Sequence, residues 1–164
     1  GQTVFFLIRF TARETRTLTL GDGWNLIAVP VHPDDPSPAA VFGGAVNGPV
    51  WRLLGDRYVR TYVIRALEGV WVYREPGRGE IDIPVTGRAV LYEDKTVDMG
   101  QGWQAAGPGD ALPFRVPDGL SEPAWVWDGA GYRAVREGDP LEPGQGYMFY
   151  GRQPGTVLNT SAYR

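Results

Sequence analysis

The stretch Thr17-Leu18-Thr19-Leu20-Gly21-Asp22-Gly23-Trp24-Asn25 returns in diverged form as Thr96-Val97-Asp98-Met99-Gly100-Gln101-Gly102-Trp103-Gln104. In both places apolar residues alternate with others, the pattern of a half-buried strand, and then run into a glycine turn and a Gly-Trp pair. A pattern that returns in the same order along a chain is the signature of an internal repeat. The chain is therefore interpreted as a tandem duplication.

Two further landmarks return in the same order, which offsets the copies by roughly 74 to 79 residues. Val50-Trp51 matches Val126-Trp127, and the segment 67–73 matches the segment 141–150. These matches predict an N-terminal segment, residues 1–12, and two repeats, residues 13–92 and 93–164. Repeats of about 80 residues are small for independent domains, so we expect them to share an interface or to borrow a strand.

Glycine and proline punctuate the whole chain, with 23 Gly and 14 Pro among 164 residues, which favours short strands and turns over long helices. Leu26 to Val31 and Val70 to Tyr73 are short apolar runs bounded by turn residues. One helical turn is expected at Pro38 to Phe42, where proline stands early. The sequence predicts an all-β fold of two tandem, internally repeated small β-sandwich or barrel units, with an extra apolar N-terminal strand.

That N-terminal strand is apolar on both faces, which requires cover on both sides. By the repeat it stands where the closing strand of a preceding copy would lie. Two readings are open: a neighbouring chain accepts it as a donated strand, or it folds back into its own first repeat. The candidate assembly residues are Val4, Phe5, Phe6, Leu7, Ile8 and Phe10.

Charge and composition exclude several classes of function. The net charge is −3, which removes the electrostatic motive for binding nucleic acid, and no apolar run is long enough for membrane insertion. The chain has no cysteine, so disulfides and thiolate chemistry are excluded. Residues 1–79 carry nine basic and seven acidic residues (+2), and residues 80–164 carry seven and twelve (−5). Opposite signs favour a head-to-tail contact between copies.

Catalytic motifs are missing from the sequence. His32 is the single histidine, so a multi-His metal site is excluded within one chain, and its place between Val31 and Pro33 in a proline-flanked polar stretch favours a loop over a catalytic role. Acidic pairs at Asp34-Asp35 and Glu93-Asp94 allow calcium, but no ligand spacing supports it. We expect no cofactor, no metal and no enzymatic activity.

The six tryptophans divide into two groups. Four of them recur at matched repeat positions and are expected in the core, because a repeated unit keeps its packing residues: Trp24, Trp51, Trp103 and Trp127. Trp125 stands one strand step from Trp127, and Trp71 is matched by a tyrosine, Tyr147. Trp71, Trp125 and Tyr132 are therefore the candidate aromatics for contact with a ligand or partner, with Trp125 the best candidate for exposure.

Gly23-Trp24-Asn25-Leu26-Ile27-Ala28-Val29-Pro30, together with the close at Leu141 to Tyr147, resembles the Gly-Trp-Asn-Leu-Ile repeats of large secreted or cell-surface bacterial and archaeal proteins. The second repeat departs from the opening motif, with Gln104-Ala105-Ala106 after its Gly-Trp. The resemblance implies an extracellular or cell-surface β module in an architectural or adhesive setting, with no catalytic residue.

These observations lead to two hypotheses of function. The first is a non-enzymatic structural subunit or repeat module of an extracellular assembly, such as a filament, sheath or surface layer. Its partners are copies of itself or neighbouring repeats, joined by donation of the N-terminal strand. The alternative is a carbohydrate-binding or adhesion module, in which exposed Trp and Tyr side chains bind a polysaccharide.

Overall fold

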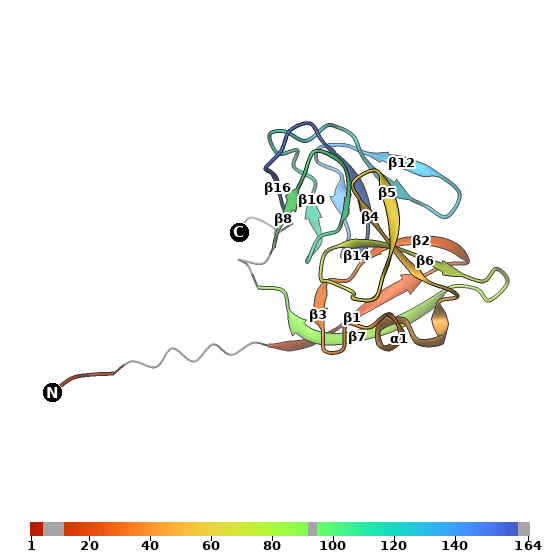
Figure 1. The fold of residues 1–164 in the computed structure, drawn as a ribbon, viewed down its shortest axis with the longest axis horizontal. Helices are drawn as coiled ribbons and strands as arrows, with labels where there is room; N and C mark the ends of the chain where they lie inside the picture. The colour runs from red at the N-terminus through yellow and green to blue at the C-terminus, as the bar shows by residue number, and fades with distance from the viewer. Residues whose placement is uncertain (5–11, 92–94, 161–164) are drawn as a thin grey trace.

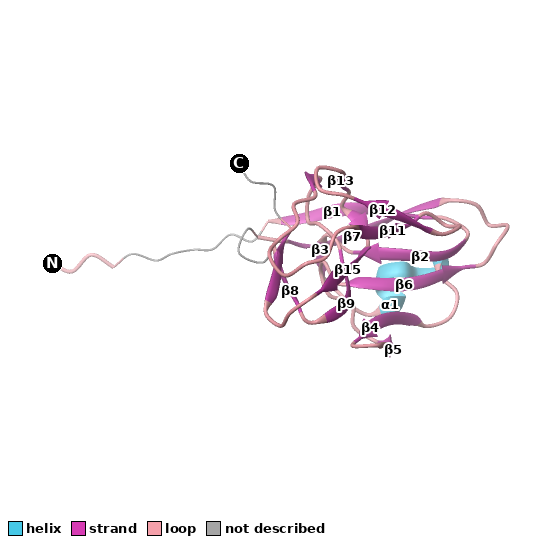
Figure 2. Ribbon diagram, turned by 90° about the horizontal axis from the view of Figure 1, so that it is seen from above, coloured by secondary structure: helices cyan, strands magenta, loops and turns pink. Residues whose placement is uncertain are grey.

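Strands form where the sequence alternates between apolar and polar residues. A computed structural model of the chain describes residues 1–4, 12–91 and 95–160, and it is 51% strand and 5% helix. In β1 (Arg13–Leu20), Arg and Thr side chains alternate with the buried Leu18 and Leu20. β7 (Ile81–Ala89) alternates in the same way and pairs antiparallel with the whole of β1. The predicted all-β class is confirmed, as Figure 2 shows.

The first half of the molecule, residues 13–91, contains a sheet of order β1-β7-β3 and most of a sheet of order β14-β2-β6-β4-β5. Its further strands are β2 (Gly23–Ala28), β3 (Val31–Pro33), β4 (Val50–Leu54), β5 (Arg57–Thr61) and β6 (Gly69–Arg74). β14 comes from the other half of the chain. Figure 1 shows the first half below the second, with β1 and β7 along its lower side.

A single helical turn interrupts the strands of the first half where the sequence predicts it. α1 (Pro38–Phe42) begins after Ser37, whose side chain accepts a hydrogen bond from the Ala40 amide at 3.3 Å. The 3-10 turn η1 (Gly43–Ala45) follows directly. Val41 and Phe42 are buried in the first core. Across the described ranges no helix is both long and apolar enough to cross a membrane.

The second half, residues 95–160, repeats the strand order of the first. Its largest sheet has the order β12-β11-β15-β9, with two small sheets, β10-β13 and β16-β8. The strands are β8 (Thr96–Met99), β9 (Gly102–Ala106), β10 (Leu112–Pro113), β11 (Ala124–Trp127), β12 (Tyr132–Val135), β13 (Pro140–Leu141), β14 (Gly144–Gln145), β15 (Tyr147–Gly151) and β16 (Thr156–Asn159). The order β2-β6-β4-β5 therefore returns as β9-β15-β11-β12. The division into two separate units at residues 92 and 93 stays a prediction.

Strand registers correct part of the sequence alignment between the halves. Trp51 of β4 pairs with Trp71 of β6, and Trp125 of β11 pairs with Met148 of β15, the strand that stands in the same place in the second half. The counterpart of Trp51 is therefore Trp125, and the match of Trp51 with Trp127 is wrong by two residues. The cause is that β11 carries two tryptophans on the same face, Trp125 and Trp127, and the sequence match took the one nearer the turn.

The strand registers also replace Tyr147 by Met148 as the counterpart of Trp71. Leu26 of β2 pairs with Trp71, and Ala105 of β9 pairs with Met148. Tyr147, the match suggested by the sequence, is buried in the core of the second half. Met148 therefore takes the place that Trp71 has in the first half.

Each half has its own apolar core, formed by one face of its large sheet and the strands beside it. The cores share no residue, and their largest fully buried members are Leu18, Leu20, Ile64, Phe114 and Phe149. Phe114 and Phe149 contact each other with ring centroids 5.7 Å apart. The apolar side chains on the inner face of each large sheet are thus buried in the core of their own half.

The two halves are joined by a reciprocal exchange of backbone pairing. β14 of the second half extends the sheet of the first, where Gln145 pairs with Ile27. At the equivalent place, Glu68 of the first half bridges to Ala106 of β9. Backbone pairing thus crosses between the two predicted repeats in both directions. Asp110 of the second half forms ion pairs with Lys95 and with Arg16 of the first half, so the Arg16 pair also joins the halves. Lys95 and Arg16 lower the pKa of the Asp110 carboxyl.

Glycines allow the two sheets to approach closely at this joint. A Cβ on Gly69 would lie 2.6 Å from the Cβ of Ala105, and a Cβ on Gly146 would lie 2.8 Å from the Cγ of Leu26. Gly69 begins β6 and Gly146 directly precedes β15, so the two glycines hold equivalent places. Neither site has room for a side chain, so the exchange depends on both glycines.

The predicted N-terminal strand falls mostly outside the described residues, which leave out Phe5, Phe6, Leu7, Ile8 and Phe10. Val4 is described, is 67% exposed and belongs to no strand. β1 already pairs along one edge with β7 of its own half. The N-terminal strand stays a prediction.

Gly69→Ala tests the joint between the halves. The added methyl group must push against Ala105, including its backbone, so we expect a loss of about 1–3 kcal/mol in the free energy of unfolding. Urea unfolding followed by far-UV circular dichroism measures it. Gly44→Ala is the matched control, because a Cβ there would meet nothing within 4 Å. Equal stability of both variants would contradict the close approach.

Candidate functional site

The two large sheets turn their outer faces, opposite to the cores, toward each other. In β2, Ile27 points into the first core, and Trp24 and Leu26 point the other way. In β11, Val126 points into the second core, and Trp125 and Trp127 point away from it. The six tryptophans therefore gather in the seam between the halves.

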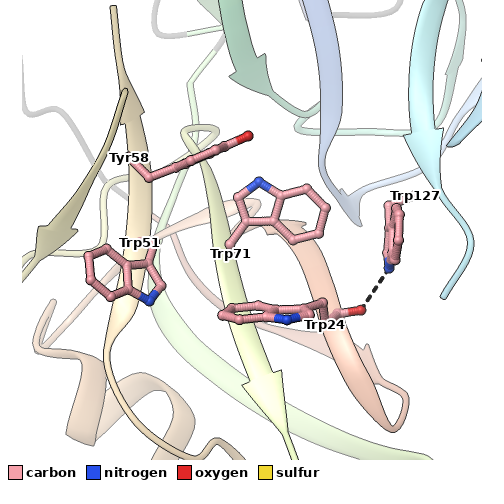
Figure 3. A pocket seen from close by; sticks show the side chains of 5 residues that line it. All are labelled: Trp24, Trp51, Tyr58, Trp71 and Trp127. Atoms are coloured by element: carbon pink, nitrogen blue, oxygen red, sulfur yellow. Dashed lines mark hydrogen bonds between the residues drawn. The ribbon is translucent and has the colours of Figure 1, made fainter. Parts of the chain in front are cut away.

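A cavity of about 510 Å³ lies in this seam, and we call it cleft 1. Figure 3 shows the five aromatic side chains that line it: Trp24, Trp51, Tyr58, Trp71 and Trp127. Trp127 belongs to the second half, and its indole Nε1 donates a hydrogen bond to the backbone oxygen of Trp24 at 2.9 Å. Both halves are thus needed to form the cleft.

Neighbouring rings of cleft 1 are nearly perpendicular to one another. Trp71 meets Trp24 at an interplanar angle of 85° and Trp127 at 75°, with ring centroids 6.4 and 5.7 Å apart. Trp24 and Tyr58 lie on opposite sides of the space in Figure 3. Their side chains remain 43% and 48% exposed. Such rings enclose a ligand from several sides, whereas a flat platform would need coplanar rings.

Trp71 carries a polar group without a partner. Its indole Nε1 is buried, and it makes no hydrogen bond with any residue that the structure describes. In Figure 3 this nitrogen points toward the hydroxyl end of Tyr58. An unmade hydrogen bond of this kind costs about 1–3 kcal/mol. A ligand oxygen that reached this N–H, with Tyr58 displaced, would recover that cost.

A second cavity of about 520 Å³, cleft 2, lies on the other side of Tyr58, which lines both. Its lining residues are Leu53, Gly55, Asp56, Tyr58, Trp103, Trp125, Tyr132 and Met148. Through the strand registers, Trp103, Trp125 and Met148 are the counterparts of Trp24, Trp51 and Trp71. The two clefts are therefore equivalent places in the two halves, each completed by residues of the other half.

Two phenols meet where the clefts join. Burial raises the pKa of the Tyr132 phenol above its usual value, and the neighbouring Tyr58 raises it further. The ring of Tyr132 also contacts Trp71 and Trp127, with centroids 6.4 and 5.3 Å away. Tyr132 thus stays neutral at physiological pH and serves as a hydrogen-bonding group.

The three aromatics predicted from the sequence all lie in the seam. Trp71 lines cleft 1, and Trp125 and Tyr132 line cleft 2. Trp125 is only partly exposed, and Trp24 and Trp103 are the tryptophans that the structure shows exposed, at 43% and 44%. Trp24 and Trp103 were expected in the core, and that expectation is wrong. Both rings lie on the outer faces of their sheets.

Sequence reasoning missed Tyr58, Asp56 and the site role of Trp24 and Trp103. One signal was present: β2 and the residue after it are apolar at both alternating sets of positions, Leu26 with Ala28 and Ile27 with Val29. A strand of that kind is covered on both faces. The seam could have been expected from that pattern, although not which side chains remain open to a ligand.

No metal centre is found among the described residues, since no three His, Asp or Glu side chains there could hold an ion together. Asp34 forms an ion pair with Arg13. The backbone amide of Ser37 donates to Asp35, which lowers the pKa of that carboxyl. Glu93 and Asp94, the other pair considered for calcium, lie outside the described residues.

No protein-family model matches the sequence, and searches of curated proteins and of solved structures found no similar chain. Function is therefore inferred from the residues that line the two clefts.

Tyr58→Phe tests the contact between the two phenols. Removal of the Tyr58 hydroxyl takes away one cause of the raised pKa, so the pKa of Tyr132 falls toward its usual value and stays above it because of burial. A phenol with a raised folded-state pKa adds stability below about pH 10 and loses it above. NMR titration of the Tyr Cζ resonances measures the shift. An unchanged Tyr132 pKa would contradict the contact.

Proposed function

We propose that the chain is a non-enzymatic binding module of an extracellular surface, which holds a glycan in cleft 1. One observation carries the proposal: aromatic rings from both halves converge on one cavity while Trp24 and Tyr58 remain about half exposed. Exposed apolar surface gathered in a cavity marks a binding site more often than a structural feature.

The chemistry of cleft 1 suits a sugar ring. Sugars have apolar C–H faces that pack on aromatic rings and hydroxyl oxygens that accept hydrogen bonds. Trp24 and Tyr58 supply opposed rings, and the Trp71 indole supplies an N–H donor that has no partner in the described protein. The residues lining cleft 1 carry no charge, which favours a neutral sugar.

The angles between the rings of cleft 1 indicate which shape of glycan fits it. Neighbouring rings of cleft 1 meet at 75° and 85°, so they do not form the flat strip that would lie along a crystalline polysaccharide. The shape favours a soluble chain end or a branch that enters the cleft between the halves. An oligosaccharide longer than one or two sugars should then bind little more tightly than a short one.

Trp24→Ala tests this proposal. Loss of one exposed wall of the cleft should weaken glycan binding about tenfold, since a stacked aromatic contact contributes about 1 kcal/mol and more when it is enclosed. A panel of neutral oligosaccharides is titrated by isothermal calorimetry and by tryptophan fluorescence. Tyr62→Ala is the matched control, because Tyr62 is exposed and stacks under Arg60 outside both clefts.

Two outcomes would contradict the proposal. One is the absence of binding across the panel by the unmodified protein. The other is equal weakening by Trp24→Ala and Tyr62→Ala, which would indicate a nonspecific effect on exposed aromatics.

A second candidate function, assembly into a filament, sheath or surface layer, is favoured by one open sheet edge. The sheet β1-β7-β3 has three strands, whereas its counterpart β16-β8 has two among the described residues. The outer edge of β16 therefore offers a place where a further strand can pair. The apolar segment from Val4 to Phe10 of a neighbouring copy has the composition of such a strand.

Deletion of residues 1–12 tests the assembly hypothesis. If the N-terminal segment joins copies, the shortened protein stays folded and monomeric, and the complete chain grows with concentration. Light scattering over a range of concentrations, with negative-stain electron microscopy on the same samples, measures this. Long polymers formed by the shortened protein would exclude donation of this strand.

A further inference from the structure

Cleft 2 differs from cleft 1 in one chemical respect: a carboxylate lines it. Asp56 lines this cavity together with Tyr58, Trp103, Trp125 and Tyr132, and no Lys or Arg is among the lining residues. We propose that cleft 2 is a site for a quaternary ammonium group, such as the trimethylammonium head of choline. The rings surround the methyl groups, and Asp56 provides the counter-charge.

The rings of cleft 2 are open to a ligand. Trp103 and Tyr132 are 44% and 49% exposed, and Tyr58, shared with cleft 1, is also about half exposed. Met148 is buried and forms apolar lining from the strand between them. A cation held over several aromatic faces within about 6 Å gains about 0.5–2 kcal/mol from each good contact, depending on how dry the site is.

The position of Asp56 leaves its charge available. Gly55 and Asp56 are the two residues that join β4 to β5, and Gly55 has a φ of 65°, which suits the first position of such a turn. Asp56 makes no hydrogen bond or ion pair with the residues that the structure describes. The turn leads directly into Tyr58, and Asp56 is exposed to solvent while it lines cleft 2.

The equivalent turn of the second half provides the contrast. Asp128 accepts hydrogen bonds from the amides of Ala130 and Gly131 at 3.0 and 2.9 Å, and these bonds lower the pKa of its carboxyl. Asp128 therefore caps its own turn, and it is not among the residues that line cleft 1. The acidic residue faces a cleft in one half only.

The same features select against a primary ammonium. A group with three N–H donors needs three acceptors when it leaves water, and besides Asp56 the side chains of cleft 2 offer only the phenol oxygens of Tyr58 and Tyr132, which already interact with each other. A methylated nitrogen has no N–H to satisfy. Its volume also fits a cavity of about 520 Å³, within the usual range for small-molecule sites, about 300–1,000 Å³.

The first experiment compares three small ligands by calorimetry with the complete chain. Choline carries the charge and the methyl groups, 3,3-dimethyl-1-butanol has the same shape without the charge, and ethanolamine has the charge without the methyl groups. We expect saturable binding of choline alone. In a parallel NMR titration the indole N–H resonances of Trp103 and Trp125 should shift most.

Two variants assign the effect to cleft 2. Asp56→Asn removes the charge at constant shape and should weaken choline binding about fivefold, and Trp103→Ala should weaken it by a similar factor. Tyr62→Ala, outside both clefts, should leave it unchanged. The proposal is overturned by no saturable binding below about 50 mM choline, by equal binding of the neutral isostere, or by full affinity in Asp56→Asn.

The source of the ammonium group is then identified with vesicles. Sedimentation with phosphatidylcholine vesicles, but not with phosphatidylglycerol vesicles, would assign a lipid or polymer headgroup displayed on a surface. Choline binding without sedimentation would assign a soluble ligand. The result does not depend on cleft 1, because the glycans tested there are neutral and these ligands are small and cationic.

Discussion

Close approach of two sheets at a pair of glycines is the constraint on which the rest of the structure depends. Gly69 packs against Ala105, and Gly146 packs against Leu26, with no room for a Cβ at either place. Backbone pairing then crosses between the halves at β14 and at Glu68. Because the sheets touch where the residues are small, the large rings beside this joint are held apart around open space. The clefts are a consequence of that difference in size.

The strands and the helical turn could be predicted because local chemistry decides them. The alternation in β1 and β7 specifies which side chains are buried, and Ser37 with Pro38 specifies where α1 begins. The small size of each repeat also predicts that they share strands. Each of these inferences needs only neighbours in the sequence or a count of residues.

The clefts could not be predicted for the same reason. Alternation shows that Trp24 and Ile27 face opposite sides of β2, but not which side meets a second sheet. Recurrence of tryptophan was interpreted as packing, whereas the recurring rings line equivalent clefts. The match of Trp51 with Trp127 failed because Trp125 and Trp127 lie on the same face of β11, and only the pairing with β15 shows which of them takes the place of Trp51. Such a shift is visible only when the hydrogen-bonded partners are known.

Comparison of the halves separates the residues that maintain the scaffold from those that determine binding. Equivalent places at the joint keep small residues, Gly69 with Gly146 and Ala28 with Gly107. Equivalent places in the clefts differ, with Trp71 in one and Met148 in the other. The turn residues differ as well, so that the Asp56 carboxylate lines one cleft and that of Asp128 caps its own turn. The joint thus keeps small glycine or alanine residues at both equivalent places, whereas the lining of the clefts differs in chemistry, which is the difference that two ligands, as proposed, require.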